Sequence, residues 1–273
     1  MAPHASRITS ILLLLLCLPT IAPAAPQRKG TDLHWQAEAG TRLVHLEGAA
    51  RIDKNGVVGT GLDFDKDLKT EGPHFSEYLD LGLHGDLVGV YLKASFLRGN
   101  GTAGPIQPLI FNGRPYATGV GLHTDISMTD VGAGLAFLST MPEGEELEFR
   151  LGLRHDTLKL SLRPGLGPAE ETHPDRLQPE YGLFTRFNLG RWVENLDLID
   201  FRAGYLESYI TDVMESGHAS SRERLLGLGL KLGDHVDLEA SYQWWNLAYS
   251  EPEHRGRLRL HMQGPGINLQ VRF

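Results

Sequence analysis

The residues closest to a catalytic pattern are His123, Asp125 and Ser127, which follow one another at two-residue spacing. In a β-strand this spacing directs all three side chains to one face. A serine, a histidine and an acid are the groups of a hydrolytic triad, but the base of a triad must be oriented by a group that reaches it from the side. The favoured interpretation is therefore a polar strand end, with a hydrolase as the alternative.

A second histidine–aspartate pair, His155-Asp156, falls on the strand expected next along the chain. The pair would complete a site beside His123. At the same point the apolar phase slips from Leu153 to Leu158, so a β-bulge explains the pair equally well.

Three acids in one loop, Asp63, Asp65 and Asp67, resemble the start of a calcium-binding loop. Such a loop needs a glycine next and a bidentate glutamate at its last position, and this chain has Leu68 and His74 there. The segment is interpreted as a solvated acidic loop. Because the histidines show no paired metal spacing either, we predict no metal and no cofactor.

Charged residues of both signs occupy alternate positions in several otherwise apolar segments. The favoured interpretation is a network of ion pairs that fills a narrow lumen, because unpaired buried charges are costly. A selectivity lining for a small polar solute is the alternative. The expected members are Lys93, Glu148, Arg150, Arg186, Arg202, Lys231, Asp237, Glu239, Arg257 and Arg259.

The elements that must position these residues are strands, because apolar residues recur with period two. The clearest example is Val88 to Phe96, and the same alternation occurs around 147–153, 226–232 and 236–244. No segment after residue 30 has 18 uninterrupted apolar residues, which argues against a membrane-spanning helix. We expect ten strands, with 8–12 compatible, near 33–52, 74–84, 87–98, 118–139, 146–162, 180–190, 198–212, 222–232, 235–249 and 257–273.

Short and long connections alternate between these strands, as they do in single-chain outer-membrane barrels. In hydrocarbon a sheet must close on itself to pair every backbone group. We therefore predict an all-β fold, a transmembrane antiparallel up-and-down β-barrel, rather than a soluble β-sandwich. Pro265 predicts a kink or bulge in the last strand. The aromatic residues expected in interfacial girdles are Trp35, Tyr181, Trp192, Tyr242, Trp244, Trp245, Tyr249 and Phe273.

The N-terminus has the pattern of a secretory signal peptide, with Arg7, an apolar run and then Ala22-Pro23-Ala24. Cleavage after Ala24 is expected, which divides the chain into a signal peptide at 1–24 and a barrel domain at 25–273. The one cysteine, Cys17, then leaves with the signal. Loss of Arg7 changes the net charge from −8 to −9, which argues against a nucleic-acid partner.

The C-terminus has Ile267, Leu269, Val271 and Phe273 on one strand face. A terminal phenylalanine after such a strand resembles the signal recognised by the outer-membrane assembly machinery, so Phe273 is the expected assembly signal. From about residue 57 the chain resembles a group of predicted outer-membrane β-barrel proteins, mostly without an assigned activity. The resemblance is carried by 61–68, 241–247 and 258–273. It implies a fold and a location, and it supplies no catalytic residues.

Three functional classes follow. The favoured one is a non-enzymatic barrel in the bacterial outer membrane, either structural or a narrow passive channel for small solutes. The second is a surface-binding barrel that acts through loops 53–73 and 99–117. The third is a lipid-A-modifying hydrolase around His123 and Ser127. The expected partners are outer-membrane lipids, lipopolysaccharide and the assembly machinery, and the sequence does not indicate an oligomeric state.

Overall fold

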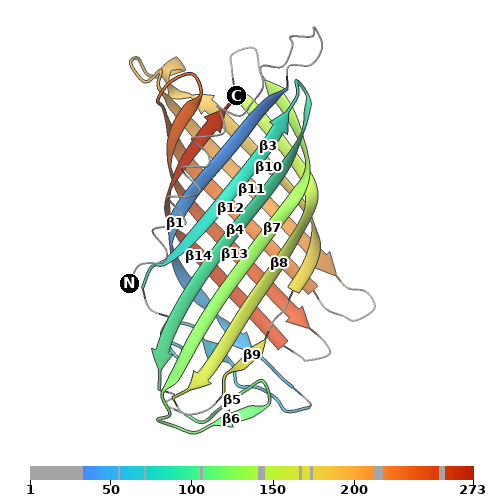
Figure 1. The fold of residues 1–273 in the computed structure, drawn as a ribbon, viewed down its shortest axis with the longest axis vertical. Coiled ribbons are helices and arrows are strands. Elements are labelled where there is room, and N and C mark those ends of the chain that lie inside the picture. The colour runs from blue at the N-terminus through green and yellow to red at the C-terminus, as the bar shows by residue number, and fades with distance from the viewer. Residues whose placement is uncertain are drawn as a thin grey trace.

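The fold is built almost entirely from long antiparallel strands (Figure 1). The computed structural model describes residues 33–54, 56–70, 72–104, 107–140, 145–165, 168–172, 175–211, 218–251 and 256–273. The expected signal peptide and its cleavage after Ala24 lie outside these residues. Within the described residues, no helix is long and apolar enough to span a membrane.

Ten long strands form the wall, and their bounds agree with the expected ranges to within a few residues at most ends. They are β1 (His34–Arg51), β3 (His74–His84), β4 (Val88–Ala103), β7 (Leu122–Thr140), β8 (Glu146–Pro164), β10 (Asp175–Asn188), β11 (Ile199–Thr211), β12 (His218–Lys231), β13 (Val236–Glu251) and β14 (Gly256–Arg272). The shorter β2 (Leu62–Asp63), β5 (Leu109–Phe111), β6 (Arg114–Tyr116) and β9 (Glu170–Thr172) belong to the connections.

The sheet closes on itself, as predicted. Each long strand pairs with the next along the chain, and the first strand, β1, pairs antiparallel with the last, β14. At this seam the Trp35 N–H donates to the Phe273 carbonyl oxygen at 3.0 Å, and the Phe273 N–H donates to the Trp35 carbonyl oxygen at 2.9 Å. No wall strand is left as an edge, which is the condition for a sheet in hydrocarbon.

The two ends of the barrel differ. The turn end carries the short connections, including the 3-10 turn Leu189–Arg191, together with the start of β1 and the end of β14. The loop end carries the connections after β1, β4, β8, β11 and β13, with β2, β5, β6 and β9 among them (Figure 1). This asymmetry confirms the predicted alternation of short turns and long loops.

Side-chain polarity inverts along the barrel. On β13 the inward residues are polar near the turn end, with Asp237, Glu239 and Ser241 buried. Nearer the loop end the inward residues are Trp245 and Leu247, also buried. The turn-end half thus has an apolar exterior and a charged interior, whereas the loop-end half has an apolar interior.

This inversion bears on the kink or bulge predicted at Pro265 and on the bulge that was one alternative at His155. At Pro265 and Gly264 the pairing of β14 with β1 is interrupted, but the register is the same on both sides of the interruption. Around Pro265, β14 stays in one register with β13, and Met262, Gly264 and Asn268 all face inward. Gly264 lets the chains approach closely there, because a side chain would meet the Leu43 carbonyl oxygen at 1.7 Å.

Around His155, β8 likewise keeps one register with β7 and β10. Leu153 faces outward in the turn-end half, where the exterior is apolar. Leu158 faces inward in the loop-end half, where the interior is apolar. At both places the strand keeps its alternation of inward and outward residues, and the side of the wall that is apolar changes.

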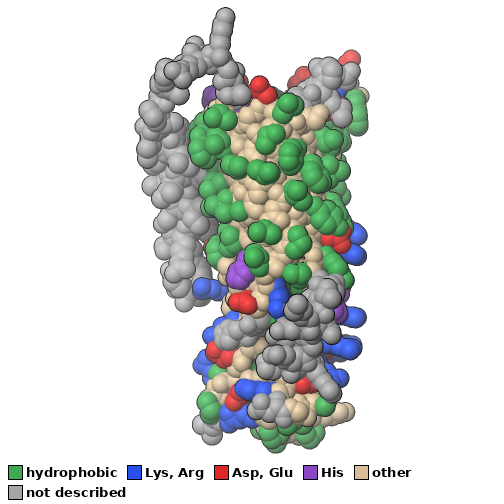
Figure 2. Space-filling view, turned by 90° about the vertical axis from the view of Figure 1, so that its right-hand side faces the viewer, with side chains coloured by type: hydrophobic (Ala, Val, Ile, Leu, Met, Phe, Trp, Pro, Cys, Tyr) green, Lys and Arg blue, Asp and Glu red, His purple; other side chains and the backbone are tan. Residues whose placement is uncertain are grey.

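Exposed apolar side chains cover the turn-end half and form the apolar band. Figure 2 shows them above a loop-end half whose surface is rich in charged side chains. Leu226, Leu228, Leu230 and Leu232 are all exposed, as predicted for a lipid-facing stripe. Other members of the apolar band are Val88, Val90, Leu92, Phe96, Val131, Leu135, Phe137, Phe149, Leu151, Leu153, Leu183, Leu238 and Ile267.

Candidate functional site

The lumen of the turn-end half holds a network of ion pairs, arranged in three groups along the axis. In the group nearest the turn end, Arg186 contacts Asp200 at 2.8 Å, Asp237 at 2.6 Å and the Gln270 amide oxygen at 2.6 Å. Lys231 contacts Asp200 at 3.0 Å. One arginine on β10 therefore joins β11, β13 and β14.

The second group contains two arginines, of which Arg150 is buried and Arg202 is partly buried. Arg202 contacts Glu38 at 2.5 Å and Glu239 at 3.4 Å. Arg150 contacts Asp80 at 2.5 Å and also Glu148, and its guanidinium lies 4.8 Å from the centre of the Tyr91 ring. Each cation thus has two carboxylate partners.

The third group lies toward the loop end and is richest in acid. The Arg154 Nε donates to the Asp156 carboxylate at 2.8 Å and lies 2.9 Å from the Asp130 carboxylate. The Lys93 Nζ lies 2.7 Å from Glu180. Both cations also approach Glu223, at 3.8 Å from Lys93 and 3.9 Å from Arg154. Two cations therefore hold four carboxylates, and the Arg154 side chain has no exposed surface.

Several of these contacts cross the full width of the lumen. Lys93 on β4 and Glu223 on β12 belong to strands separated by four others in either direction around the barrel. The same is true of Arg272 on β14 and Glu146 on β8, which are 3.8 Å apart. The network therefore ties opposite walls of the barrel together across the lumen.

The ten residues expected in this network do not all lie on the same side of the wall. The structure puts eight of the ten expected members in the lumen. Arg257 and Arg259 are the exceptions and correct the prediction, since they are exposed on the outer face and Leu258 and Leu260 beside them are buried. These two arginines belong to the loop-end half, where the apolar face of a strand points inward.

Sequence reasoning missed several carboxylates and one arginine of the network. Glu38, Asp80, Asp130, Arg154, Glu180 and Glu223 were not singled out, and Asp156 was considered only as part of a catalytic pair with His155. For Arg154 and Asp156 the signal was present, because they continue the alternation that begins at Glu148 and Arg150. Trp245, expected in an interfacial girdle, is buried in the lumen, where its Nε1 donates to Ser221 at 2.6 Å.

The loop-end half is filled by a second structure, the loop-end core. Inward side chains of the wall, such as Leu46, Leu97 and Leu260, meet side chains from the connections. The contribution of the connections is Leu62, Phe64, Leu68, Leu109, Phe111 and Tyr116, all buried. Burial and the nearby Glu170 raise the pKa of the Tyr116 phenol. Two loops therefore fold back into the barrel and pack against its inner wall.

Hydrogen bonds and an ion pair join these connections to one another. The Thr60 N–H donates to the Ile110 carbonyl oxygen at 2.8 Å, and the Ile110 N–H donates to the Thr60 hydroxyl at 2.9 Å. Arg114 lies 3.4 Å from Glu170, which links the β5–β6 hairpin to β9. The described parts of the loops predicted at 53–73 and 99–117 are thus bonded to each other and form one cap.

The acidic segment 63–67 forms a turn within this cap. The Asp63 carboxylate accepts from the N–H groups of Asp65 and Lys66, both at 3.0 Å, and the Asp67 carboxylate accepts from the Asp63 N–H at 2.8 Å. Among the residues that the structure describes, no group of three potential ligands is placed to hold a metal ion.

His123, Asp125 and Ser127 do share one face of β7, but that face is the outer surface of the loop-end half. The His123 Nε2 lies 3.3 Å from Asp125, and its Nδ1 lies 3.3 Å from the Thr102 hydroxyl. Both ring nitrogens therefore have partners other than Ser127. The His155 Nε2 lies 3.9 Å from Asp175, and Asp156 points into the lumen.

Solved structures that are similar to this chain include outer-membrane proteins. The outer membrane protease OmpT from Escherichia coli matches with a TM-score of 0.58 and 8% identity, over 90% of this chain and 99% of that chain. The outer membrane protein OprG from Pseudomonas aeruginosa gives 0.36 and 10%, over 89% and 97%. No known family profile and no curated protein matches the sequence. The likeness shows the fold, a closed barrel of the outer-membrane type.

Proposed function

We propose that this protein is an exported outer-membrane barrel that conducts no solute and presents its loop end at the cell surface as a rigid binding platform. The short turns then lie in the periplasm and the long loops outside, as in other single-chain barrels of this type. The proposal adopts the surface-binding alternative in preference to a narrow channel.

The observation that carries the proposal is that cross-lumen ion pairs and a packed apolar core occupy the lumen of the described barrel. Ion pairs such as Lys93–Glu223 cross the lumen in the turn-end half. Beyond them the loop-end core packs Phe64, Leu68 and Phe111 with no exposed surface. A solute would have to break buried ion pairs and displace packed aromatic side chains, and both steps are costly.

The cap also has the features of a binding surface. Its loops are long, and long ordered loops on a rigid scaffold commonly carry function. Hydrogen bonds from Thr60 to Ile110 and the ion pair from Arg114 to Glu170 hold its shape. A preordered surface loses little conformational entropy when a partner binds.

Single-channel recording in planar bilayers tests the proposal. We expect no steady conductance steps from the folded protein, with insertion verified separately by flotation of proteoliposomes and by heat-modifiable migration on gels. Regular ohmic steps that scale with the number of inserted molecules would refute the filled lumen and restore the passive-channel interpretation.

A further inference from the structure

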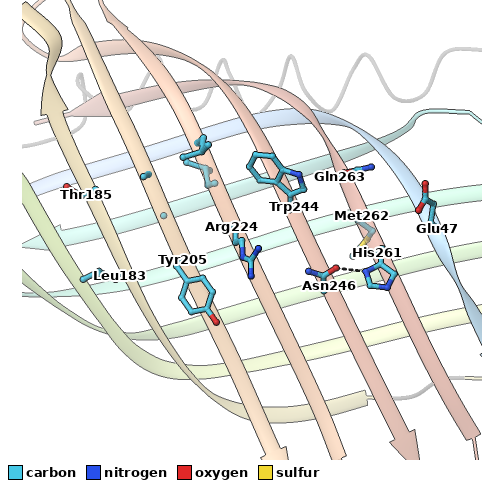
Figure 3. Close-up of a pocket in the computed structure, with 14 residues that line it drawn as sticks. Glu47, Leu183, Thr185, Tyr205, Arg224, Trp244, Asn246, His261, Met262 and Gln263 are labelled. Carbon is cyan, nitrogen blue, oxygen red and sulfur yellow. Dashed lines mark hydrogen bonds between the residues drawn. The ribbon is translucent and has the colours of Figure 1, made fainter.

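A shallow groove runs across the outer face of the barrel where the apolar band ends (Figure 3). Tyr205, Arg224, Trp244 and Gln263 are register partners on four successive strands, β11 to β14, and they form one row of the groove. The next row toward the turn end contains Leu226 and belongs to the apolar band. The groove therefore lies at the border between hydrocarbon-facing and water-facing surface.

Arg224 is the unneutralised cation of this groove. Its neighbour on the same face, Arg222, donates to Glu207 at 2.7 Å, and Tyr205 and Tyr181 donate to the same carboxylate at 2.6 and 2.9 Å. Arg224 is exposed and makes no ion pair or hydrogen bond with any residue that the structure describes. An arginine held at a membrane border without an acidic partner is available to an anionic ligand.

Hydrogen-bond donors surround this cation. The Trp244 indole is the register partner of Arg224 and carries one N–H. The Asn246 amide oxygen contacts the His261 Nδ1, so the amide NH₂ of Asn246 stays available. The carboxylate among the groove's lining residues, Glu47, lies 3.3 Å from the His45 Nε2. The groove is therefore rich in hydrogen-bond donors around the Arg224 guanidinium.

We infer that this groove binds the phosphate of a phosphorylated glycolipid of the outer leaflet. The Arg224 guanidinium would hold the phosphate through charge-assisted hydrogen bonds, with Trp244 and Asn246 as further donors. The acyl chains would lie along Leu226, Leu228 and Leu183 of the apolar band. The inference rests on the outer-membrane location proposed above, because it takes the loop end to face outward.

The test compares lipid binding by the full chain with that of two variants, folded in mild detergent. Arg224→Gln removes the unpaired cation, and Arg259→Gln makes the same charge change at an exposed outward position nearer the loop end. The probe is bisphosphorylated lipid A, and native mass spectrometry gives its affinity. We expect Arg224→Gln to weaken binding about tenfold or more, in line with the loss of hydrogen bonds to a charged group, and Arg259→Gln to change it less than about twofold.

Two further arms separate specific recognition from other outcomes. Dephosphorylated lipid A should bind the original protein and Arg224→Gln equally, and millimolar inorganic phosphate should not displace the lipid. Equal affinity of both variants for the phosphorylated probe, or displacement by free phosphate, would overturn the inference. These measurements do not depend on conductance, so they remain interpretable if the filled lumen is refuted. Heat-modifiable migration confirms that each variant is folded.

Discussion

At the scale of single residues, the lumen contains cationic side chains that each contact several carboxylates. Arg154 is the extreme case, because its side chain is fully buried and contacts Asp130 and Asp156 directly. Its guanidinium also lies 4.8 Å from the centre of the Trp245 ring. In this buried environment each charge is stabilised by its ion-pair partners. Removal of one charged side chain therefore leaves the others uncompensated.

Replacement of Arg154 by methionine tests this dependence. Because four carboxylates would then share Lys93 alone, we expect the free energy of unfolding to fall by about 3–5 kcal/mol. Urea unfolding of the protein in lipid bilayers, followed by tryptophan fluorescence, measures the change. Arg259→Met on the exposed outer face is the matched control and should stay within about 0.5 kcal/mol. A similar loss in both variants would mean that the network does not stabilise the fold.

The sequence predicted which strand positions carry lumen charges but not which charges pair. Alternation along one strand identified Glu148, Arg150, Asp237 and Glu239, because inward positions recur every second residue. Pairs such as Arg202 with Glu38 join residues 164 apart. β1 and β11 face each other only because the barrel is closed. The alternation of residues along one strand carries no information about which strands face each other.

At the scale of elements, each long strand crosses two environments. β12 shows this directly, since Leu228 and Leu230 face outward in the apolar band, whereas Arg222 faces outward in the loop-end half. Strand positions were predictable because period two persists throughout. The register is kept at both His155 and Pro265, and a change of solvent outside the barrel resembles a change of phase when only residue types are known. At Pro265 the ladder to β1 is nevertheless interrupted.

Two arginine substitutions on the outer face of β12 test the inversion. Leu228→Arg places a charge within the apolar band and should cost about 2–4 kcal/mol, as measured for lipid-facing positions near the bilayer midplane. Ser220→Arg places the same side chain on the same face of the same strand in the loop-end half. It should change the free energy of unfolding by no more than about 0.5 kcal/mol.

Bilayer unfolding titrations provide both values, and a detergent titration provides a reference without a bilayer. If Ser220→Arg cost as much as Leu228→Arg, the boundary between the two halves would not be a membrane boundary, and the apolar band would need another explanation.

At the scale of the whole molecule, the barrel is closed laterally by the β1–β14 seam, and its lumen contains the ion-pair network and the loop-end core. The sequence predicted the closure, because paired edges are required of a sheet in hydrocarbon. It did not predict that the loops fold inward to build the loop-end core. Phe64 and Phe111 lie in segments without clear periodicity, so their burial depends on tertiary packing that local pattern does not encode.

The most direct test of the account is a disulfide across the seam. Ala50 on β1 and Leu258 on β14 are register partners, so Ala50→Cys with Leu258→Cys should cross-link in protein isolated from the outer membrane. Tyr249 is the partner of Leu258 on β13, two strands from β1, or about 10 Å at the usual strand spacing. Ala50→Cys with Tyr249→Cys should therefore not cross-link. The account predicts altered migration of the first variant alone on non-reducing gels after boiling. Free thiols in that variant, or equal cross-linking in both, would contradict a closed barrel.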